Sequence, residues 1–317
     1  MTILAHPSFA EDVRHYLQLT PRQLPSRFLY DPLGSALFDA ICELPWYGIT
    51  RAESRLLAEH RREIFAHLPG LTRIAELGPG DGRKLQTLVE GTSHSLTAHL
   101  IDISAGALAR AAHTLSDAAN VTVVTHEASF EDGLEEIAEL PDYDISYGRP
   151  LVLFLGSNIG NFDPPASRAL LRRMRTSVGH GGALLIGADL VKPERDLLLA
   201  YDDPLGVSAA FNLNLLLRIN QELGGDFDLR AFHHRAVWIA VCSRMEMFVV
   251  SATAQHVRID AIDLDMDLAE SEAIWTESSY KYTAAGLMRL LEDAGFKPVA
   301  QWIDREDQFA LTLARAT

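Results

Sequence analysis

The sequence predicts an α/β protein whose main sheet is parallel and doubly wound, with helices on both faces. Between residues 71 and 191, short apolar runs alternate with amphipathic runs, which is typical of successive strand and helix units. Right-handed crossovers between such units place ligands at the carboxyl ends of the strands. The alternation stops after residue 192, so we expect other material to interrupt or flank this α/β domain. A length of 317 residues agrees with about two domains.

The region before the alternation predicts two helices. Residues 31–43 form the first, because Asp31 can cap its amino end and a proline fits the first helical position. A connector rich in aromatic residues follows. Thr50 and Glu53 then have the spacing of a capping box, which predicts a helix over the amphipathic residues 51–68.

Five strands and three helices are expected in the alternating region, from apolar runs of strand length and from helical periodicity. The expected strands cover residues 72–77, 97–103, 121–129, 150–158 and 181–191. The expected helices cover residues 83–92, 104–119 and 165–178.

The material after residue 192 mixes both kinds of element. Helical segments are expected over residues 194–223, with an interruption, and 284–296, and β-rich segments over residues 235–259 and 308–314. Gly295 would close the later helix at its carboxyl end. Residues 263–273 are acidic, and we expect them to form a solvated loop.

Composition and charge exclude several classes of protein. Apolar residues make up 48% of the chain and charged residues 22%, which is ordinary for a globular protein and excludes a disordered chain. The net charge of -15 disfavours nucleic acid and anionic lipid surfaces as partners. A small ligand in an enclosed site is the natural partner.

The remaining composition signals indicate a cytoplasmic protein with neither metal nor disulfide. Cys42 and Cys242 lie far apart, without the spacing of a zinc site, and we expect buried reduced thiols. The amino-terminal residues lack the pattern of a signal peptide. The apolar runs are far shorter than the ~20 residues of a membrane span.

A glycine-rich loop follows the first strand of the alternating region. Gly78, Gly80 and Gly82 form G-x-G-x-G, which lets the backbone turn tightly and approach a ligand. Dinucleotide-binding folds need G-x-G-x-x-G, whereas position 83 is Arg. The pattern E/D-x-G-x-G-x-G is instead that of S-adenosylmethionine-dependent methyltransferases. A generic glycine turn is the alternative.

The ends of the next two strands offer further candidate ligands for such a cofactor. Asp102 can accept hydrogen bonds from both ribose hydroxyls, and Ser104 can cap the following helix in its place. Ser129 stands where methyltransferases often have an acid for the adenine amino group, and it could accept one hydrogen bond. Phe130 could pack on the adenine or belong to the core.

The sequence resembles the L-histidine Nα-methyltransferases of ergothioneine biosynthesis. The matching stretches are FLYDPLGSALFDAI, LPWYGITRAE, ELGPG, LVLFLGSNIGNF, GADLVK, YDDPLGVSAAFN, TAQHVRI and TESSYK, between residues 28 and 281. The resemblance implies a Rossmann-like methyltransferase domain and a discontinuous α+β substrate-binding domain. The first would comprise residues 53–191 and 282–317, and the second residues 1–52 and 192–281.

The resemblance also implies which residues bind substrate and cofactor. Asn161 and Tyr201 match the pair that holds the substrate carboxylate. Tyr30 and Gly156 match residues beside the α-amine. The residues matching the imidazole-binding groups are Tyr47 for one ring nitrogen and Glu277 and Ser279 for the other, with Phe211 and Met247 shaping the ring pocket. The cofactor-binding set is Gly78, Gly80, Lys84, Asp102, Ser129 and Phe130.

The residue types suit a free amino acid on chemical grounds. An amide and a phenol can bind a carboxylate without placing a full positive charge beside a sulfonium. An imidazole needs an acceptor for its N–H and a partner for its other nitrogen, which Glu, Tyr and Ser supply. Taken singly, Glu277 and Lys281 also fit a helical i,i+4 ion pair, and His233 and His234 fit a surface pair.

Three departures from the family pattern bear on the binding sites. Ser129 replaces an acid, Asn158 stands where threonine is frequent, and Ser278 stands where an apolar residue is usual. Two alternatives stay open. One is an N-methyltransferase for another aromatic amino acid of the tryptophan type, against which Glu277 and Ser279 argue, and the other is a non-catalytic ligand-binding relative, which Ser129 would suit.

The implied reaction is in-line displacement of methyl from the sulfonium of S-adenosylmethionine by the α-amine of histidine. Tyr30, a water held near it or bulk solvent would take the proton that leaves the amine. Catalysis would come mainly from proximity and alignment, without a metal. Three successive transfers would give trimethylhistidine (hercynine). We expect a monomer, and nothing in the sequence bears on the binding order.

Overall fold

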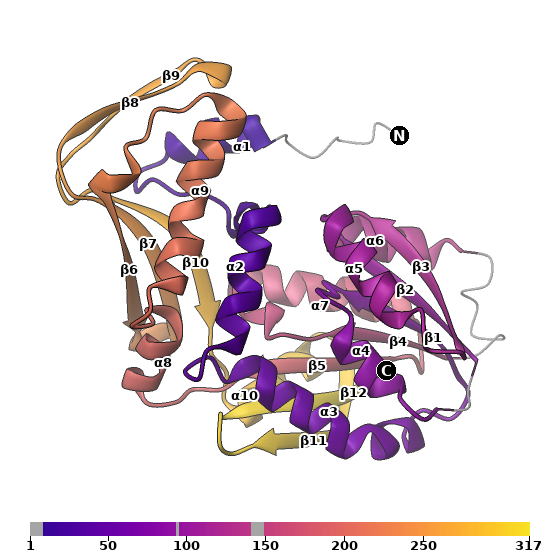
Figure 1. The fold of residues 1–317 in the computed structure, drawn as a ribbon. Helices are drawn as coiled ribbons and strands as arrows, with labels where there is room; N and C mark the ends of the chain where they lie inside the picture. The colour runs from indigo at the N-terminus through magenta and orange to yellow at the C-terminus, as the bar shows by residue number, and fades with distance from the viewer. Residues whose placement is uncertain (1–8, 93–94, 141–148) are drawn as a thin grey trace. The chain divides into compact units, whose positions relative to one another are not determined.

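The chain folds into two compact units in the computed structural model, which describes residues 9–92, 95–140 and 149–317 (Figure 1). Unit 1 comprises Met1–Tyr47 and Lys192–Ser279, and unit 2 comprises Gly48–Val191 and Tyr280–Thr317. The first residues of the chain, on which the expectation of no signal peptide rested, lie outside the described residues. No described helix combines the length and the apolar character that crossing a membrane requires.

Unit 2 is built on a seven-stranded sheet with the order β11-β12-β5-β4-β1-β2-β3. The strands are β1 (Leu71–Leu77), β2 (Leu96–Asp102), β3 (Val121–Glu127), β4 (Arg149–Phe154), β5 (Ala183–Asp189), β11 (Phe296–Asp304) and β12 (Phe309–Ala316). The five strands of the alternating region pair in parallel, as predicted. Strand β12 is antiparallel to both of its neighbours, and β11 had not been expected.

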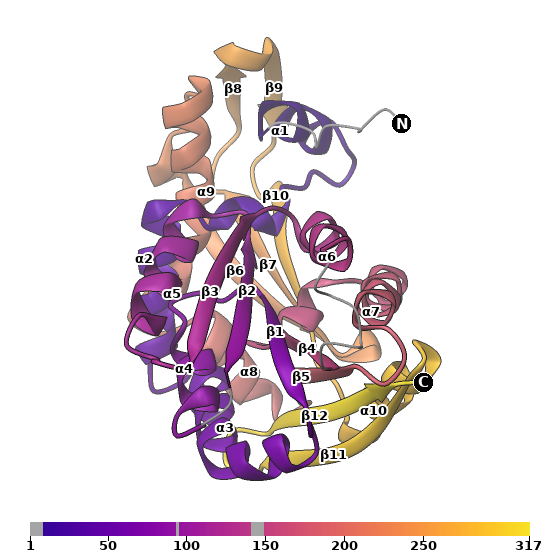
Figure 2. The same ribbon diagram turned by 90° about the vertical axis from the view of Figure 1, so that its right-hand side faces the viewer.

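Helices cover both faces of this sheet. They are α3 (Ile49–Ala66), α4 (Arg83–Val89), α5 (Ala105–Leu115), α6 (Phe130–Ala138), α7 (Pro164–Val178) and α10 (Ala284–Asp293). Helix α4 contacts α3 and α5 on one face, and helix α7 contacts α6 and α10 on the other (Figure 2). The α/β fold class is therefore confirmed.

The core explains why these segments became strands and helices. Strand β5 is buried at every residue, which is the burial of a central strand covered on both faces. Apolar residues of α6, α7 and α10, including Leu134, Met174 and Leu291, join one buried cluster with Val152 and Ile186 of the sheet. Each such side chain contributes about 1.5–3 kcal/mol on burial, which stabilises the layered packing.

Unit 1 combines helices with two small sheets. Its helices are α1 (Phe9–Leu17), α2 (Pro32–Glu43), α8 (Glu194–Tyr201) and α9 (Val207–Leu223). Its strands are β6 (Phe232–Ile239), β7 (Arg244–Ser251), β8 (Gln255–Ile259), β9 (Leu264–Leu268) and β10 (Ala273–Tyr280). Strands β10, β7 and β6 form one sheet and β8 and β9 a second. Helix α9 contacts α2, β6 and β7 (Figure 1).

Several local predictions are confirmed at helix ends. Asp31 caps α2 by accepting a hydrogen bond from the backbone of Gly34. Ser104 caps α5 through the backbone of Ala107. Gly295 follows α10 with a φ of +86°, where a side chain would be strained.

Other local predictions are wrong. Helix α3 has Gly48 at its cap, with no capping side chain, so Thr50 and Glu53 form no capping box. The acidic segment contains β9, whose residues alternate between buried and exposed, because Leu264, Met266 and Leu268 fill one face. The two cysteines form no disulfide, but neither is buried as expected: Cys42 is partly exposed and Cys242 is exposed.

Candidate functional site

The glycine loop of unit 2 lies between β1 and α4, at the carboxyl end of the strand. The φ angles of Gly78, Gly80 and Gly82 are +71°, +59° and +80°, a region that only glycine adopts readily. A Cβ on Gly78 would lie 3.0 Å from Asn158 Nδ2 and 3.5 Å from the Phe130 ring. The loop therefore runs close to both side chains, and a side chain at position 78 would crowd them.

The sheet topology identifies this edge as the ligand-binding edge. Strand β1 pairs with β2 on one side and with β4 on the other, and the chain order reverses between β1 and β4. In open parallel sheets such a switch point leaves a crevice outside the carboxyl ends of the strands.

Asp102 ends β2 at the same edge. Its Oδ1 accepts a hydrogen bond from the backbone N–H of Ser104 at 2.8 Å. Burial raises the pKa of Asp102, and hydrogen bonds from the backbone oppose that rise. Because Ser104 caps α5, the Asp102 carboxylate is not needed for the cap.

Ser129 and Phe130 begin α6. Ser129 caps the helix, and its hydroxyl donates to Asp132 Oδ2 at 2.7 Å while accepting from the Asp132 backbone. Asp132 thus places a carboxylate about one helical turn after position 129, where the resemblance leads us to expect an acid. The Phe130 ring packs against Phe154 and Phe162, with centroids 5.7 and 6.5 Å apart.

The turn after β4 carries two predicted substrate residues, Gly156 and Asn161. Ser157 has a φ of +59°, a left-handed conformation that costs a non-glycine residue about 1–3 kcal/mol. Its Oγ accepts a hydrogen bond from the Asp189 backbone at 2.9 Å, which holds the strained turn against β5. Asn161 belongs to the following 3-10 turn, Asn158–Asn161.

Glu53 is a site residue that the sequence reasoning misassigned. Its side chain is completely buried, and its two oxygens accept from the Gly156 backbone at 2.9 and 2.8 Å. Glu53 Oε2 also lies 2.6 Å from Lys84 Nζ. The Gly156 N–H is thus engaged within the protein.

A second buried acid, Glu76, lies beside this pair. Its side chain is 1% exposed, and Oε2 has no hydrogen-bond partner within the described part of the chain. Burial raises the pKa of Glu76 to about 8, with nearby Lys84 acting against the rise and Glu53 adding to it. The side chain is therefore mostly protonated at neutral pH.

The predicted substrate residues of unit 1 meet in an aromatic cluster. The Tyr30 ring contacts Phe211 edge-on, with centroids 5.5 Å apart. Phe38 of α2 lies 5.4 Å from Tyr30, 6.1 Å from Tyr47 and 5.9 Å from Phe211 between ring centroids. Phe38 was not predicted as a site residue, although it lies within the matched FLYDPLGSALFDAI stretch.

Polar groups converge on the same cluster. The Tyr201 hydroxyl donates to Ser279 Oγ at 2.8 Å, and both side chains are buried. Burial raises the pKa of Tyr47 well above its ordinary value, and Tyr201, Tyr30 and Glu277 reinforce the rise. Tyr47 therefore keeps its proton and can donate a hydrogen bond.

The geometry of strand β10 sets the direction of the Glu277 side chain. Glu277 and Ser279 lie two residues apart in β10, so they project from the same face while Ser278 projects from the other. The helical ion pair with Lys281 is therefore wrong as an interpretation. Met247, buried in the neighbouring β7, accepts a hydrogen bond at its backbone from Thr276.

Of the two adjacent histidines, His233 and His234, only the first is exposed at the surface. His233 is exposed, but His234 Nε2 lies 2.9 Å from the Tyr201 carbonyl oxygen. Burial lowers the pKa of His234. The neutral ring thus donates from Nε2 to Tyr201, and Nδ1 accepts from Asn212 at 2.9 Å. The surface prediction is wrong for His234, which supports the end of α8 instead.

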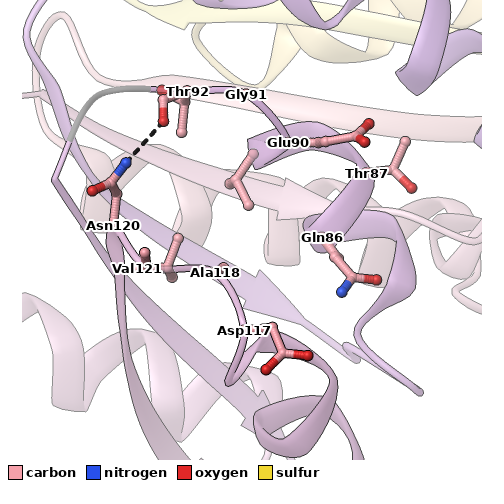
Figure 3. A pocket seen from close by; sticks show the side chains of 11 residues that line it. Gln86, Thr87, Glu90, Gly91, Thr92, Asp117, Ala118, Asn120 and Val121 are labelled. Atoms are coloured by element: carbon pink, nitrogen blue, oxygen red, sulfur yellow. Dashed lines mark hydrogen bonds between the residues drawn. The ribbon is translucent and has the colours of Figure 1, made fainter.

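A pocket of about 440 Å³ lies elsewhere in unit 2. Its lining includes Gln86, Glu90, Asp117, Asn120 and Val121, around the ends of α4 and α5 and the start of β3 (Figure 3). It therefore lies at the amino ends of the strands, away from the glycine loop, and we do not assign it to the cofactor. Among the described residues, no cluster of three His, Cys, Asp or Glu side chains could hold a metal ion.

Comparisons with known proteins agree with the predicted family. A family profile described as a histidine-specific, SAM-dependent methyltransferase matches residues 9–316. The chain is 39% identical to a histidine N-alpha-methyltransferase of Mycolicibacterium smegmatis, covering 98% of this chain and 97% of that protein. It is 37% identical to the protein of that name from Mycobacterium tuberculosis, covering 98% and 95%. An ergothioneine biosynthesis protein 1 of Neurospora crassa is 26% identical, over 89% of this chain and 32% of that longer protein.

Proposed function

Because the chain belongs to the family of SAM-dependent, histidine-specific methyltransferases, we propose that it methylates the α-amine of L-histidine with S-adenosylmethionine. The product after three transfers is trimethylhistidine, which would make this reaction the first step of ergothioneine biosynthesis. The net charge of -15 supports a small zwitterionic substrate over a polyanion.

The observation that carries the substrate assignment is the polar set within the aromatic cluster of unit 1. Tyr47, Ser279 and Glu277 combine a phenol that keeps its proton, a hydroxyl and a carboxylate. An imidazole N–H requires an acceptor, which Glu277 supplies, and the other ring nitrogen accepts from Tyr47. An indole ring has a single N–H and no second nitrogen, so it would leave the Tyr47 hydroxyl without its partner.

The carboxylate and the amine are assigned by resemblance. Tyr201 and Asn161 match the family's carboxylate-binding pair and are the proposed carboxylate ligands. To donate to the carboxylate, the Tyr201 hydroxyl would turn away from Ser279 Oγ, its partner in the structure. Tyr30 is proposed to line the space at the amine. Gly156 contributes room and not a hydrogen bond, because Glu53 already accepts from its N–H. That room suits an amine that grows by a methyl group at each turnover.

The residues of unit 2 fit S-adenosylmethionine. The glycine loop leaves space that a Cβ on Gly78 would fill, against Asn158 and Phe130. Asp102 is proposed to accept from the ribose hydroxyls and Phe130 to pack on the adenine. Lys84, Gly80 and Ser129 complete the proposed set. When bound, the cofactor supplies a methyl group activated by a sulfonium.

Because the cofactor supplies the activated methyl group, the side chains of the protein mainly bind and orient the reactants. They align the α-amine with the methyl group, and such alignment is the main source of the rate enhancement. The amine attacks only when neutral, so the ammonium group loses one proton before each of the three transfers. We assign Tyr30 to the position beside that proton. Tyr201 and Asn161 fix the carboxylate so that each partly methylated product binds again in one orientation.

Mass spectrometry with a panel of amino acids tests the proposal. Purified enzyme with S-adenosylmethionine should add up to three methyl groups to histidine, and dimethylhistidine should also be converted. Histamine, which lacks the carboxylate, is the matched control and should react poorly. Methylation of tryptophan in preference to histidine would refute the imidazole assignment. Failure to bind S-adenosylhomocysteine by calorimetry would refute the cofactor assignment.

A further inference from the structure

Glu53 links the turn after β4 to the first turn of helix α4 at the ligand-binding edge of unit 2. It lies on α3, outside the strand ends, yet its carboxylate reaches the Gly156 N–H after β4 and the Lys84 ammonium after β1. Strands β1 and β4 are the neighbours between which the chain order reverses. A single buried side chain therefore holds together the two sides of the crevice.

The surroundings of Glu53 are shaped to hold it. A Cβ at Gly187 of β5 would lie only 1.9 Å from Glu53 Oε1, so this position leaves room for the carboxylate because it is glycine. A Cβ at Gly156 would lie 3.1 Å from Lys84 Nζ. The Glu53 carboxylate therefore contacts both the Gly156 backbone in the turn after β4 and the Lys84 ammonium in α4.

Stability alone is a poor reason for this arrangement. A buried ion pair is often no more stabilising than well-packed apolar side chains, because both ions lose their hydration. Glu53 is completely buried, whereas the Lys84 side chain is 21% exposed. The Glu53 carboxylate therefore lies deeper in the protein than the Lys84 ammonium. The ammonium remains partly exposed and can reach a ligand at this edge.

Glu76, the other buried acid nearby, does not replace Glu53 as the anionic partner of Lys84. Glu76 is mostly protonated at neutral pH, since burial raises its pKa to about 8. The carboxylate that contacts Lys84 Nζ, at 2.6 Å, belongs to Glu53.

We propose that Glu53 is a positioning residue that orients Lys84 to bind the carboxylate at the methionyl end of the cofactor. A cation in this place matches the only anionic group of S-adenosylmethionine. The inference rests on the cofactor part of the proposed function and is independent of the identity of the acceptor amine.

Glu53→Gln separates the charge of Glu53 from its hydrogen bonds. Glutamine can still accept from the Gly156 N–H, but it offers Lys84 no charge. The measurement is calorimetric binding of S-adenosylhomocysteine, which carries the methionyl carboxylate, and of methylthioadenosine, which lacks it. We expect the first affinity to fall about tenfold or more, as for a charged hydrogen bond, and the second to change less than about twofold.

Three further variants keep the result interpretable if Glu53→Gln is less stable. Glu59→Gln, on the same helix with an exposed side chain, is the matched control and should leave both affinities unchanged. Lys84→Met should weaken S-adenosylhomocysteine alone. Combining it with Glu53→Gln removes both charges, so no unpaired ion is left, and should weaken binding no further than Lys84→Met does.

The outcomes are distinct. Equal loss of both ligands in Glu53→Gln, or loss of neither, would overturn the positioning role, as would additive effects in the double variant. Wild-type protein that binds methylthioadenosine and S-adenosylhomocysteine equally well would also overturn it, because Lys84 would then not address the carboxylate. Wild-type protein that binds neither would overturn the proposed function as well.

Discussion

Replacing Glu76 by glutamine should make the protein increasingly more stable than wild type as the pH rises. Glu76 is buried in β1 with Oε2 lacking a hydrogen-bond partner within the described ranges, and burial raises its pKa to about 8 from an ordinary value of 4.5. Between these values the folded chain keeps a proton that the unfolded chain has released. The free energy of unfolding therefore falls with rising pH across this window.

The magnitude follows from the width of the window. An interval of about 3.5 pH units corresponds to about 5 kcal/mol, or about 1.4 kcal/mol for each pH unit. Glutamine is neutral throughout and carries no such dependence. The difference in unfolding free energy between Glu76→Gln and wild type should thus grow by about 3 kcal/mol from about pH 5.5 to about pH 7.5, and level off above pH ~8.

Urea unfolding followed by fluorescence measures this difference in unit 2 alone. Trp302 is the only tryptophan of unit 2, so the experiment uses a background in which the three others are phenylalanine. Glu59→Gln, an exposed acid on α3, is the control and should give a difference independent of pH. A constant difference for Glu76→Gln over the same range would show that Glu76 ionises normally and that the burial argument is wrong.

Three other substitutions test the proposed binding roles. Glu277→Ala should raise the KM for histidine about 10- to 100-fold, the value of a hydrogen bond to a charged group, with little change in S-adenosylhomocysteine affinity by calorimetry. Asp102→Ala should do the reverse, because the ribose loses its acceptor. Tyr201→Phe removes the hydrogen bond to Ser279 and a carboxylate ligand, and should cost about 1 kcal/mol in unfolding free energy and raise the KM for histidine.

Each of these predictions has a contrary outcome. If Glu277→Ala weakened histidine and S-adenosylhomocysteine binding equally, the proposed role of Glu277 at the imidazole would be refuted. Unchanged cofactor affinity in Asp102→Ala would refute the ribose assignment. A Tyr201→Phe enzyme with normal KM for histidine, measured beside the surface control Glu59→Gln, would show that the phenol serves packing only.

Local sequence signals anticipated much of the fold. The caps at Asp31 and Ser104 and the glycine at position 295 act within a few residues of themselves, so their spacing alone identifies them. Central strands such as β5 were predicted from apolar runs because a strand covered on both faces is apolar at nearly every position, whereas β3 at the sheet edge has no buried residue. Strand β9 was missed because its exposed aspartates obscured a short alternating pattern.

The same local reasoning failed at Glu53. Its distance from Thr50 is that of a capping box, but the helix begins at Ile49 and carries Glu53 to the buried side of α3. Its partner Gly156 is 103 residues away, and no spacing rule connects the two. His234 was misjudged for the same reason, since its neighbour along the chain is exposed while its own bonding partners lie 22 and 33 residues away.

The sequence by itself determined the α/β class, the position of the glycine loop and, through resemblance, the family of this protein. These rest on periodicity and on motifs that each occupy a short stretch of chain. Only the tertiary structure decided that Glu53 fixes Lys84, that Tyr201 donates to Ser279 and that Glu76 is buried enough to keep its proton. The pKa of a side chain and its bonding partners depend on which distant segments exclude water around it, and that is settled only when the chain packs.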